Sequence, residues 1–210
     1  MQLLDEYKEM RQDIRDLNSL ILEDVEKSYI LKAAETLGVL ENGSVVLESH
    51  PEQDAFYDFI VYGKMMDGKS TLSHYMEKNL SHEDDDQLLN IMKDSEVSLY
   101  KIDHVDRENK TIRLINVADS SLTHEVIDLS LSQTVTENML ICTRLLHFES
   151  FSMTSGLLFL FKADHLEYLR KRSRKMIKKM NKGNASDKRF VAYFKLNRKD
   201  GLPTAMEDVE

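Results

Sequence analysis

The amino-acid sequence indicates an α+β protein. A helical N-terminal half is expected to pack on a five-stranded antiparallel meander or small barrel, followed by a basic amphipathic helix. Two observations favour this architecture. Between Val97 and Phe161, five short runs rich in β-branched and aromatic residues follow one another with polar or glycine-bearing breaks. On either side of them, apolar residues recur at helical spacing among charged ones.

A long amphipathic helix is predicted for residues 1–40. The chain has no Gly or Pro before Gly38, and its apolar residues recur at alternating spacings of four and three. These positions are Leu3, Tyr7, Met10, Ile14, Leu17 and Ile21. Such spacing forms an a/d seam, which packs on another apolar surface. The seam is the predicted partner interface, and it is expected to lie either on the chain's own body or on a dimer partner.

Residues 41–95 are predicted to be mostly helical, after one short strand at 44–48. Pro51 is suited to the first turn of a helix, where a backbone N–H is not needed, and apolar residues follow it on one helical face. The expected helices are 52–62, 70–79 and a third that opens at Ser81 and carries Leu88, Leu89, Ile91 and Met92.

An acidic cluster precedes the third of these helices. It comprises Glu83, Asp84, Asp85 and Asp86. The cluster lacks the spacing of a calcium loop, and carboxylates at a helix start are favoured by the helix dipole. His74 and His82 lie near it without the spacing of a zinc motif. We therefore expect a capping box formed by Ser81 and Asp84, after a turn at 65–68, and no metal site.

Residues 96–162 are predicted to form the β unit. In the run from Ile112 to Val117, side chains alternate and both faces are partly apolar. A sheet that closes on itself under covering helices explains such a pattern. Hairpin turns are expected at 107–110 and 136–138, and a turn or bulge at 155–156. A small SH3-like or OB-like barrel and an open, twisted sheet both fit these runs.

Residues 163–210 are predicted to hold a basic helix and a last strand. Asp164 is placed to cap the helix, which is expected to run to about Lys182 with one apolar stripe. The run FVAYFKL at 190–196 is apolar and aromatic, so a strand or a docked extended segment is expected there. All four segments are expected to form one compact unit.

Charge is distributed unevenly along the chain. Residues 161–210 contain 14 Lys and Arg against 7 Asp and Glu, whereas the rest of the chain contains 14 against 30. Eight of the basic residues lie within 13 positions: Arg170, Lys171, Arg172, Arg174, Lys175, Lys178, Lys179 and Lys182. They are the predicted nucleic-acid-binding residues, because dense cations neutralise phosphates. A solvated face that pairs with the acidic body, in the same chain or across a dimer, and an anionic membrane surface are the alternatives.

Signatures of catalysis are missing. The chain has neither GxSxG nor a glycine-rich phosphate loop. Its single cysteine, Cys142, lies in an apolar run, where a buried inert thiol is expected. His104, His124 and His147 come from three predicted strands, and their convergence in a barrel would suit a hydrolase site. We expect neither cofactor nor metal, and the leading function is not enzymatic.

The runs FYDFIVYGKMMDGKSTLSHYMEKNLSHEDDDQLLNIMKDSEVSLYKIDHV, IRLINVAD, MLICTRLL and TSGLLFLF, within residues 56–161, resemble the helical-plus-β region of some bacterial proteins that also carry a SEC-C motif. The corresponding residues are Phe56, Phe59, Asp67, Gly68, Ser70, Thr71, Leu99, Tyr100, Arg144, Ser155 and Gly156. The resemblance implies this fold and a bacterial cytoplasmic setting. The cysteine-rich, zinc-binding SEC-C element itself is absent.

Two functions are expected from these features. The leading one is a non-enzymatic interaction or adaptor protein of bacterial type, which acts through amphipathic helices on a protein partner or as a dimer. The second is an RNA- or ribosome-associated protein, with the barrel as platform and the basic helix as phosphate clamp. Tyr100 and Phe148 are its candidate stacking residues if they are exposed. Because no signal peptide or membrane span is recognised, a cytoplasmic location is expected.

Overall fold

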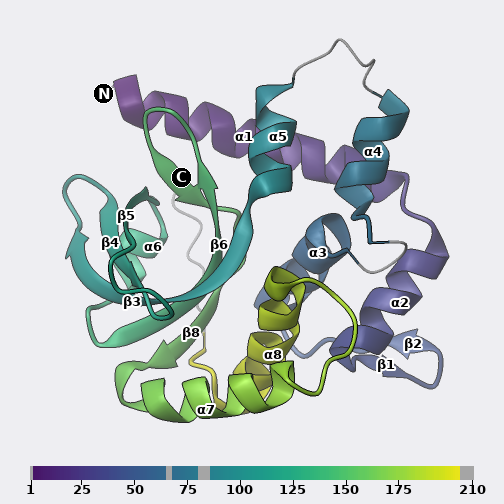
Figure 1. Ribbon diagram of the computed structural model, residues 1–210. Helices are drawn as coiled ribbons and strands as arrows, with labels where there is room; N and C mark the ends of the chain where they lie inside the picture. The colour runs from purple at the N-terminus through teal and green to yellow at the C-terminus, as the bar shows by residue number, and fades with distance from the viewer. Residues whose placement is uncertain (1, 65–67, 80–85, 204–210) are drawn as a thin grey trace.

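The computed structural model describes residues 2–64, 68–79 and 86–203 (Figure 1). The helices are α1 Gln2–Glu23, α2 Lys27–Leu37, α3 His50–Tyr62, α4 Thr71–Asn79, α5 Gln87–Asp94, α6 Leu131–Thr134, α7 Leu166–Ile177 and α8 Ala185–Asp200. The strands are β1 Leu40–Glu41, β2 Ser44–Val45, β3 Glu96–Asp106, β4 Thr111–Asn116, β5 Thr123–Ile127, β6 Met139–His147, β7 Ser152–Thr154 and β8 Phe159–Lys162. The predicted α+β architecture is confirmed.

Five strands close into a barrel, in the order β3, β4, β5, β7, β6 and back to β3. Neighbouring strands are antiparallel except β5 and β7, which pair in parallel at Val126 and Ser152. The predicted small barrel is therefore closed and mixed. The parallel pair arises because β7 returns antiparallel to β6 and lies between β6 and β5. The last predicted run is divided near Gly156, whose φ of +104° suits only glycine well. Its first part, β7, closes the barrel, and its second part, β8, extends the sheet beside the start of β6.

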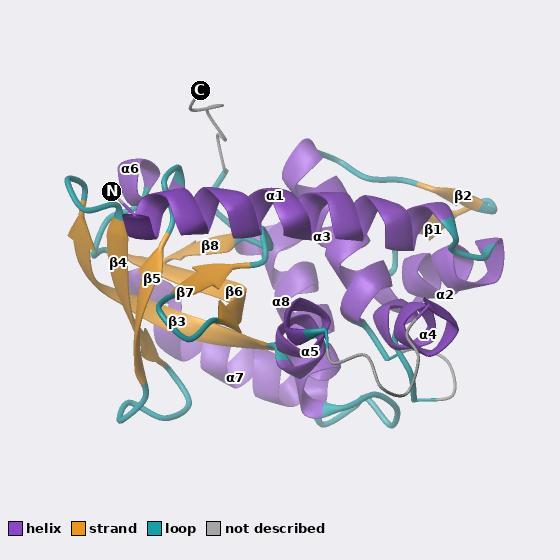
Figure 2. Ribbon diagram, turned by 90° about the horizontal axis from the view of Figure 1, so that it is seen from above, coloured by secondary structure: helices purple, strands orange, loops and turns teal. Residues whose placement is uncertain are grey.

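Both faces of the barrel wall are buried. Side chains such as Ile102, Leu114 and Val126 fill the interior, and Leu131 of α6 packs into the same cluster. Alternate residues of β3, β6 and β8 face outward and pack against α2, α3 and α8 in a second cluster. This double burial explains why the strands lack a simple apolar-polar alternation. Figure 2 shows the barrel on one side of the molecule and most helices on the other, with α1 running along both.

The predicted last strand at 190–196 is wrong, because these residues belong to α8. The Asn184 side chain caps this helix by accepting a hydrogen bond from the Asp187 N–H at 2.8 Å. Most of its apolar residues are buried: Phe190, Val191, Ala192, Tyr193, Phe194 and Leu196. A helix buried on nearly all sides has no apolar stripe, so its pattern cannot be distinguished from that of a buried strand.

The single helix predicted over 1–40 is also wrong. Two helices, α1 and α2, are separated by a break at residues 24–26. α2 ends at Gly38, whose φ of +79° places it in the left-handed region. Arg11 of α1 is held on the barrel, where its Nη1 donates to the Thr154 carbonyl at 2.7 Å and its Nη2 pairs with Asp128 at 3.1 Å.

Several predicted helix ends are corrected or lie outside the described residues. The turn at 65–68 lies partly in the part not described, as do Ser81 and Asp84 of the predicted capping box. Asp86 caps α5 instead, accepting from the Leu89 N–H at 3.1 Å. Asp164 lies in a 3₁₀ turn, Ala163–His165, and provides no cap for α7, which ends at Ile177 rather than near Lys182.

No helix in residues 2–64, 68–79 or 86–203 combines the length and apolar character that crossing a membrane requires.

A buried ion pair joins the helical half to the barrel. Arg144 of β6 pairs with Asp58 of α3 at 3.1 Å, and both side chains are less than a tenth exposed. The guanidinium also donates to the Ser95 carbonyl at 3.1 Å, and the Ser155 hydroxyl donates to Asp58 at 2.8 Å. The guanidinium lies over the Tyr62 ring, 4.1 Å from its centroid. The network joins Asp58 and Tyr62 of α3, Arg144 of β6, and Ser95 and Ser155 of the connecting segments, so it fixes how α3 lies against the barrel.

We expect Arg144→Met and Asp58→Leu each to lower the free energy of unfolding by about 3–5 kcal/mol, because each leaves a buried charge without its partner. The double variant should lose less than the sum of the two. Arg113→Met, which breaks a half-exposed pair with Asp103, is the control and should change stability far less. Urea unfolding followed by circular dichroism measures all four. Additive losses would show that the two charges are not coupled.

Candidate nucleic-acid interface

One narrow side of α7 holds it on the body. Leu169 and Ser173 are buried, and the Ser173 hydroxyl accepts a hydrogen bond from the Tyr193 hydroxyl of α8 at 3.3 Å. Leu166 and Met176 are partly buried against the same core. The apolar stripe predicted from the sequence is therefore used for packing, and it turns the remaining surface of α7 towards solvent.

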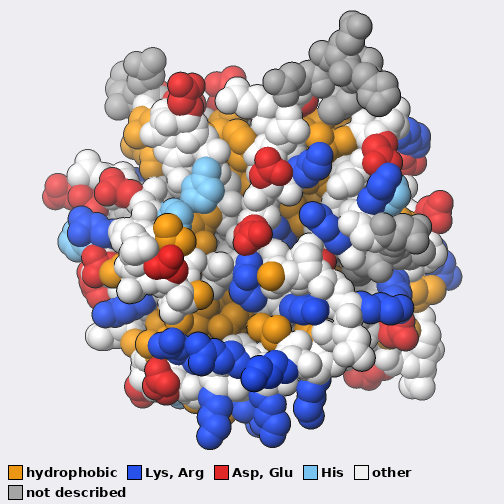
Figure 3. Space-filling model, in the orientation of Figure 1, with side chains coloured by type: hydrophobic (Ala, Val, Ile, Leu, Met, Phe, Trp, Pro, Cys, Tyr) orange, Lys and Arg blue, Asp and Glu red, His pale blue; other side chains and the backbone are white. Residues whose placement is uncertain are grey.

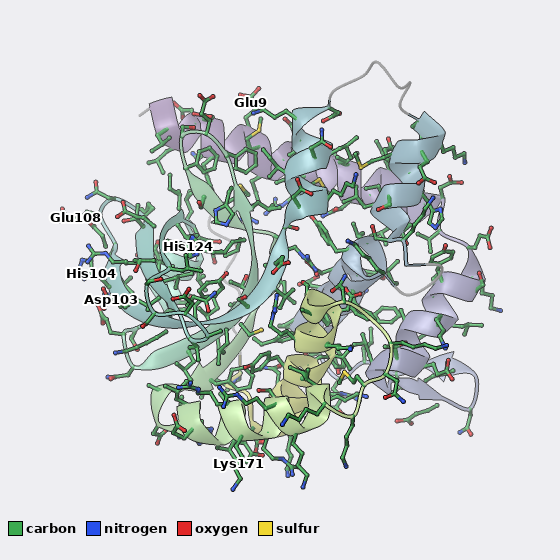
Figure 4. The ribbon with its side chains drawn as sticks, in the orientation of Figure 1. Glu9, Asp103, His104, Glu108, His124 and Lys171 are labelled. Carbon is green, nitrogen blue, oxygen red and sulfur yellow. The ribbon has the colours of Figure 1, made fainter. Side chains whose placement is uncertain are left out.

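The solvent side of α7 is cationic. Lys171, Arg172, Arg174 and Lys175 are exposed on the helix, and Lys178, Lys179 and Lys182 are exposed in the turn that follows it. Figure 3 shows Lys and Arg side chains gathered along the edge formed by α7, and Figure 4 shows Lys171 pointing away from the body. We call these seven residues the cationic ridge.

The cationic ridge is not neutralised by the acidic body. In residues 2–64, 68–79 and 86–203, no carboxylate lies within 4 Å of a nitrogen of these seven side chains. Arg170, the eighth predicted residue, is half-buried and pairs with Glu167 at 3.5 Å. The helix dipole accounts for cations in the last turn, such as Arg174 and Lys175, but not for Lys171 and Arg172 in the middle of the helix.

The seam of α1 is used within the chain. Tyr7, Ile14 and Ile21 are buried in a cluster that also contains Leu146 and Met153 of the barrel. Met10 and Leu17 are partly buried against the same cluster, and Leu3 is 42% exposed. Of the two settings predicted for this seam, the structure shows it on the chain's own body.

The two predicted stacking residues are not presented as expected. Tyr100 is 4% exposed and contributes to the barrel interior. Phe148 is half-buried and stacks on Phe151, with 4.9 Å between ring centroids. Tyr100 is inaccessible because its position on β3 faces the barrel interior. The sequence pattern could not show which face is the interior, because both faces of this strand carry apolar residues.

Two of the three barrel histidines converge. The ring centroids of His124 and His147 lie 5.0 Å apart, and the rings of Tyr100 and His124 form a T-shaped contact with 5.8 Å between centroids. His104 lies elsewhere. It is exposed, with its Nδ1 3.9 Å from a carboxylate oxygen of Glu137, and Figure 4 shows it apart from His124, nearer the outer edge of the barrel. In the part of the chain that the structure describes, neither imidazole of the pair forms an ion pair with a carboxylate, so no acid-base dyad is assembled there.

The remaining candidates for a catalytic or binding site are a buried thiol and a cavity lined by charged groups of both signs. Burial raises the pKa of the Cys142 thiol, which keeps it protonated. A cavity of about 220 Å³ opens at the start of α8, with Lys64, Lys93, Asp187 and Glu96 in its lining. Sequence reasoning missed this cavity because its walls come from segments far apart in the chain. Among the described residues, no group of three or more His, Cys, Asp or Glu is arranged to hold a metal ion.

Acid should destabilise the protein through the His124–His147 pair. Burial lowers the pKa of both imidazoles, and for His147 the charge of His124 lowers it further. The unfolded chain, with histidine pKa values near 6.5, therefore binds more protons than the folded one as pH falls below about 7. Stability contributed by the neutral pair is present above that pH and lost below it.

We therefore expect His124→Gln/His147→Gln to reduce the drop in unfolding free energy between pH 7.5 and pH 5.5. Urea unfolding at the two pH values measures it, with His104→Gln as control because His104 is exposed on the same barrel. An unchanged drop in the double variant would contradict this assignment.

Comparison with known proteins gives a family but no activity. No curated protein and no solved structure matches the chain. Nothing in these comparisons connects it with proteins that carry a SEC-C motif, so that resemblance stays a prediction. The model of a family of unknown function, DUF7986, matches residues 1–207, and the chain belongs to this family.

Proposed function

We propose that the protein binds RNA through the cationic ridge of α7. The observation that carries this proposal is the ridge itself: seven exposed Lys and Arg side chains without a carboxylate partner among the described residues. Unpaired, solvated cations release phosphate counterions when a nucleic acid binds, which gives affinity without base-specific contacts. Residues 1–160 contain 30 acidic residues against 14 basic ones, so this part of the chain repels a polyanion and directs it to the ridge.

Packing favours a nucleic acid over a membrane surface. A helix that lies in a membrane interface buries an apolar face among the lipids. In α7 the apolar residues Leu166, Leu169 and Met176 already pack on the body. Tyr168 is 38% exposed, and the rest of the outward surface of α7 is mostly charged.

The α1 seam supports a partner interface less well. Its central residues fill the chain's own core, and exposing them would cost the burial that holds α1 on the barrel. A second copy of the chain that offers its acidic surface to the ridge is the competing partner. Light scattering after size exclusion at low and high salt distinguishes it, because such a dimer forms without nucleic acid.

RNA binding should depend on the ridge and on salt. We expect fluorescence anisotropy with a generic single-stranded RNA to show binding at low salt. Lys171→Glu/Arg172→Glu/Arg174→Glu/Lys175→Glu should abolish most of it. If these residues neutralise four phosphates, the slope of log K against log salt concentration should become less steep by about 3 in the variant.

The matched control is Lys8→Glu/Arg15→Glu/Lys27→Glu/Lys101→Glu, which changes the net charge equally at exposed positions away from α7. It should retain the larger part of the affinity. An equal loss in both variants would show a general charge effect rather than a site. Tighter binding of DNA than of RNA would reassign the ligand, and no binding to either at micromolar protein would refute the proposal.

A further inference from the structure

The His124–His147 pair lies at one end of the barrel. His124 is near the start of β5 and His147 is the last residue of β6. Both strands flank β7, with β5 parallel and β6 antiparallel to it, so the start of β5 and the end of β6 meet at the same end. α6 follows β5 and packs into the barrel core from the opposite end.

His124 and His147 occupy strand positions on the face that points to the apolar interior of the barrel. Side chains alternate along a strand, so His124 shares its face with Val126, and His147 shares its face with Leu145. Both of those neighbours are fully buried in the barrel core. His147 is exposed, His124 is half-buried, and the two rings are tilted by 33°. Two polar aromatic rings are thus partly accessible at this end of the barrel.

The pair is oriented and has few charged neighbours. Nδ1 of His147 lies 2.8 Å from the Ser152 hydroxyl of β7, which holds the ring in place. From β3 the facing group is Tyr100, whose pKa is raised to about 12 by burial, so it stays neutral. On β5, Glu125 points to the other face of the strand, opposite Arg113 of β4. Each imidazole is thus free to take up a proton when an anion approaches.

Figure 4 labels His124 on the barrel and Lys171 on α7 in one view. Figure 3 shows histidine side chains on the barrel and the Lys and Arg side chains of α7 in one view. A nucleic-acid strand that contacts both sites has to reach from α7 to this end of the barrel.

We propose that the His124–His147 pair is a second contact for the same RNA, in which an unpaired base stacks on an imidazole and the pair takes up a proton on binding. The proposal rests on RNA binding by the ridge. Histidine is among the side chains on which unpaired RNA bases stack. A nearby phosphate favours the imidazolium form, whereas in the free protein partial burial lowers the pKa of both imidazoles.

Proton uptake has a measurable consequence. If binding takes up one proton, the affinity rises by up to about tenfold for each unit by which pH falls between the bound and free pKa values. The cationic ridge cannot produce this dependence, since Lys and Arg stay charged throughout.

The experiment measures the Kd of the full chain for a 12-nucleotide oligouridine at pH 7.5, 6.5 and 5.5 and constant ionic strength. We expect the wild type to bind several-fold more tightly at pH 5.5 than at pH 7.5. His124→Gln/His147→Gln should show a flat profile, and His104→Gln should keep the wild-type one. His147→Gln alone, at an exposed position, gives a second variant that does not depend on repacking the barrel. Circular dichroism at each pH confirms that the compared proteins are folded.

A base analogue reports the stacking directly. An oligouridine with one 2-aminopurine should lose fluorescence on binding to the wild type and lose less with His147→Gln. Wild-type pH dependence and wild-type quenching in the histidine variants would overturn this inference while leaving the ridge proposal intact. Failure of the wild type to bind RNA at any of the three pH values would instead overturn the proposed function, and this inference with it.

Discussion

The contact between Arg144 and Asp58 is the constraint on which the arrangement of the two halves depends. A charge pair this deeply buried is tolerated only with good geometry and with its remaining hydrogen bonds satisfied. Here the hydrogen-bonding partners are Ser95, at the junction of α5 and β3, and Ser155, beyond the end of β7. Sliding α3 along the barrel would separate several of these groups at once. A different docking of the helical half would leave these buried charges without their partners, and that cost disfavours it.

That docking determines what is left at the surface. With α3 placed against β6, α8 fills the space between the helical half and the barrel, where aromatic rings such as Phe59, Phe159 and Phe190 meet. α7 then packs on α8 and the adjoining core through one narrow stripe. Its cations face solvent because the acidic residues of the body lie elsewhere. The exposure of the proposed interface thus depends on how α3, α8 and α7 pack together as much as on the local sequence.

Local patterns predicted the barrel strands, the helices at 52–62 and 70–79, and the apolar stripe of α7. They failed where one residue pattern fits two environments. The run from Phe190 to Leu196 is apolar on all sides whether it is a buried helix or a buried strand, and only its surroundings separate the two. The α1 seam has the spacing of a coiled coil, but a helix on its own barrel needs the same spacing. The convergence of His124 and His147, without His104, follows from strand register, which three separate positions in the sequence do not contain.

The sequence by itself determined the α+β architecture, the five-run β unit and the concentration of positive charge between Arg170 and Lys182, because these depend on periodicity and composition within short segments. Only the tertiary structure decided which cations stay unpaired, which surface α1 covers, and which side chains meet at the barrel end. Those outcomes depend on contacts between residues far apart in the chain. Such contacts are selected by the packing and charge balance of the whole fold rather than by any local preference.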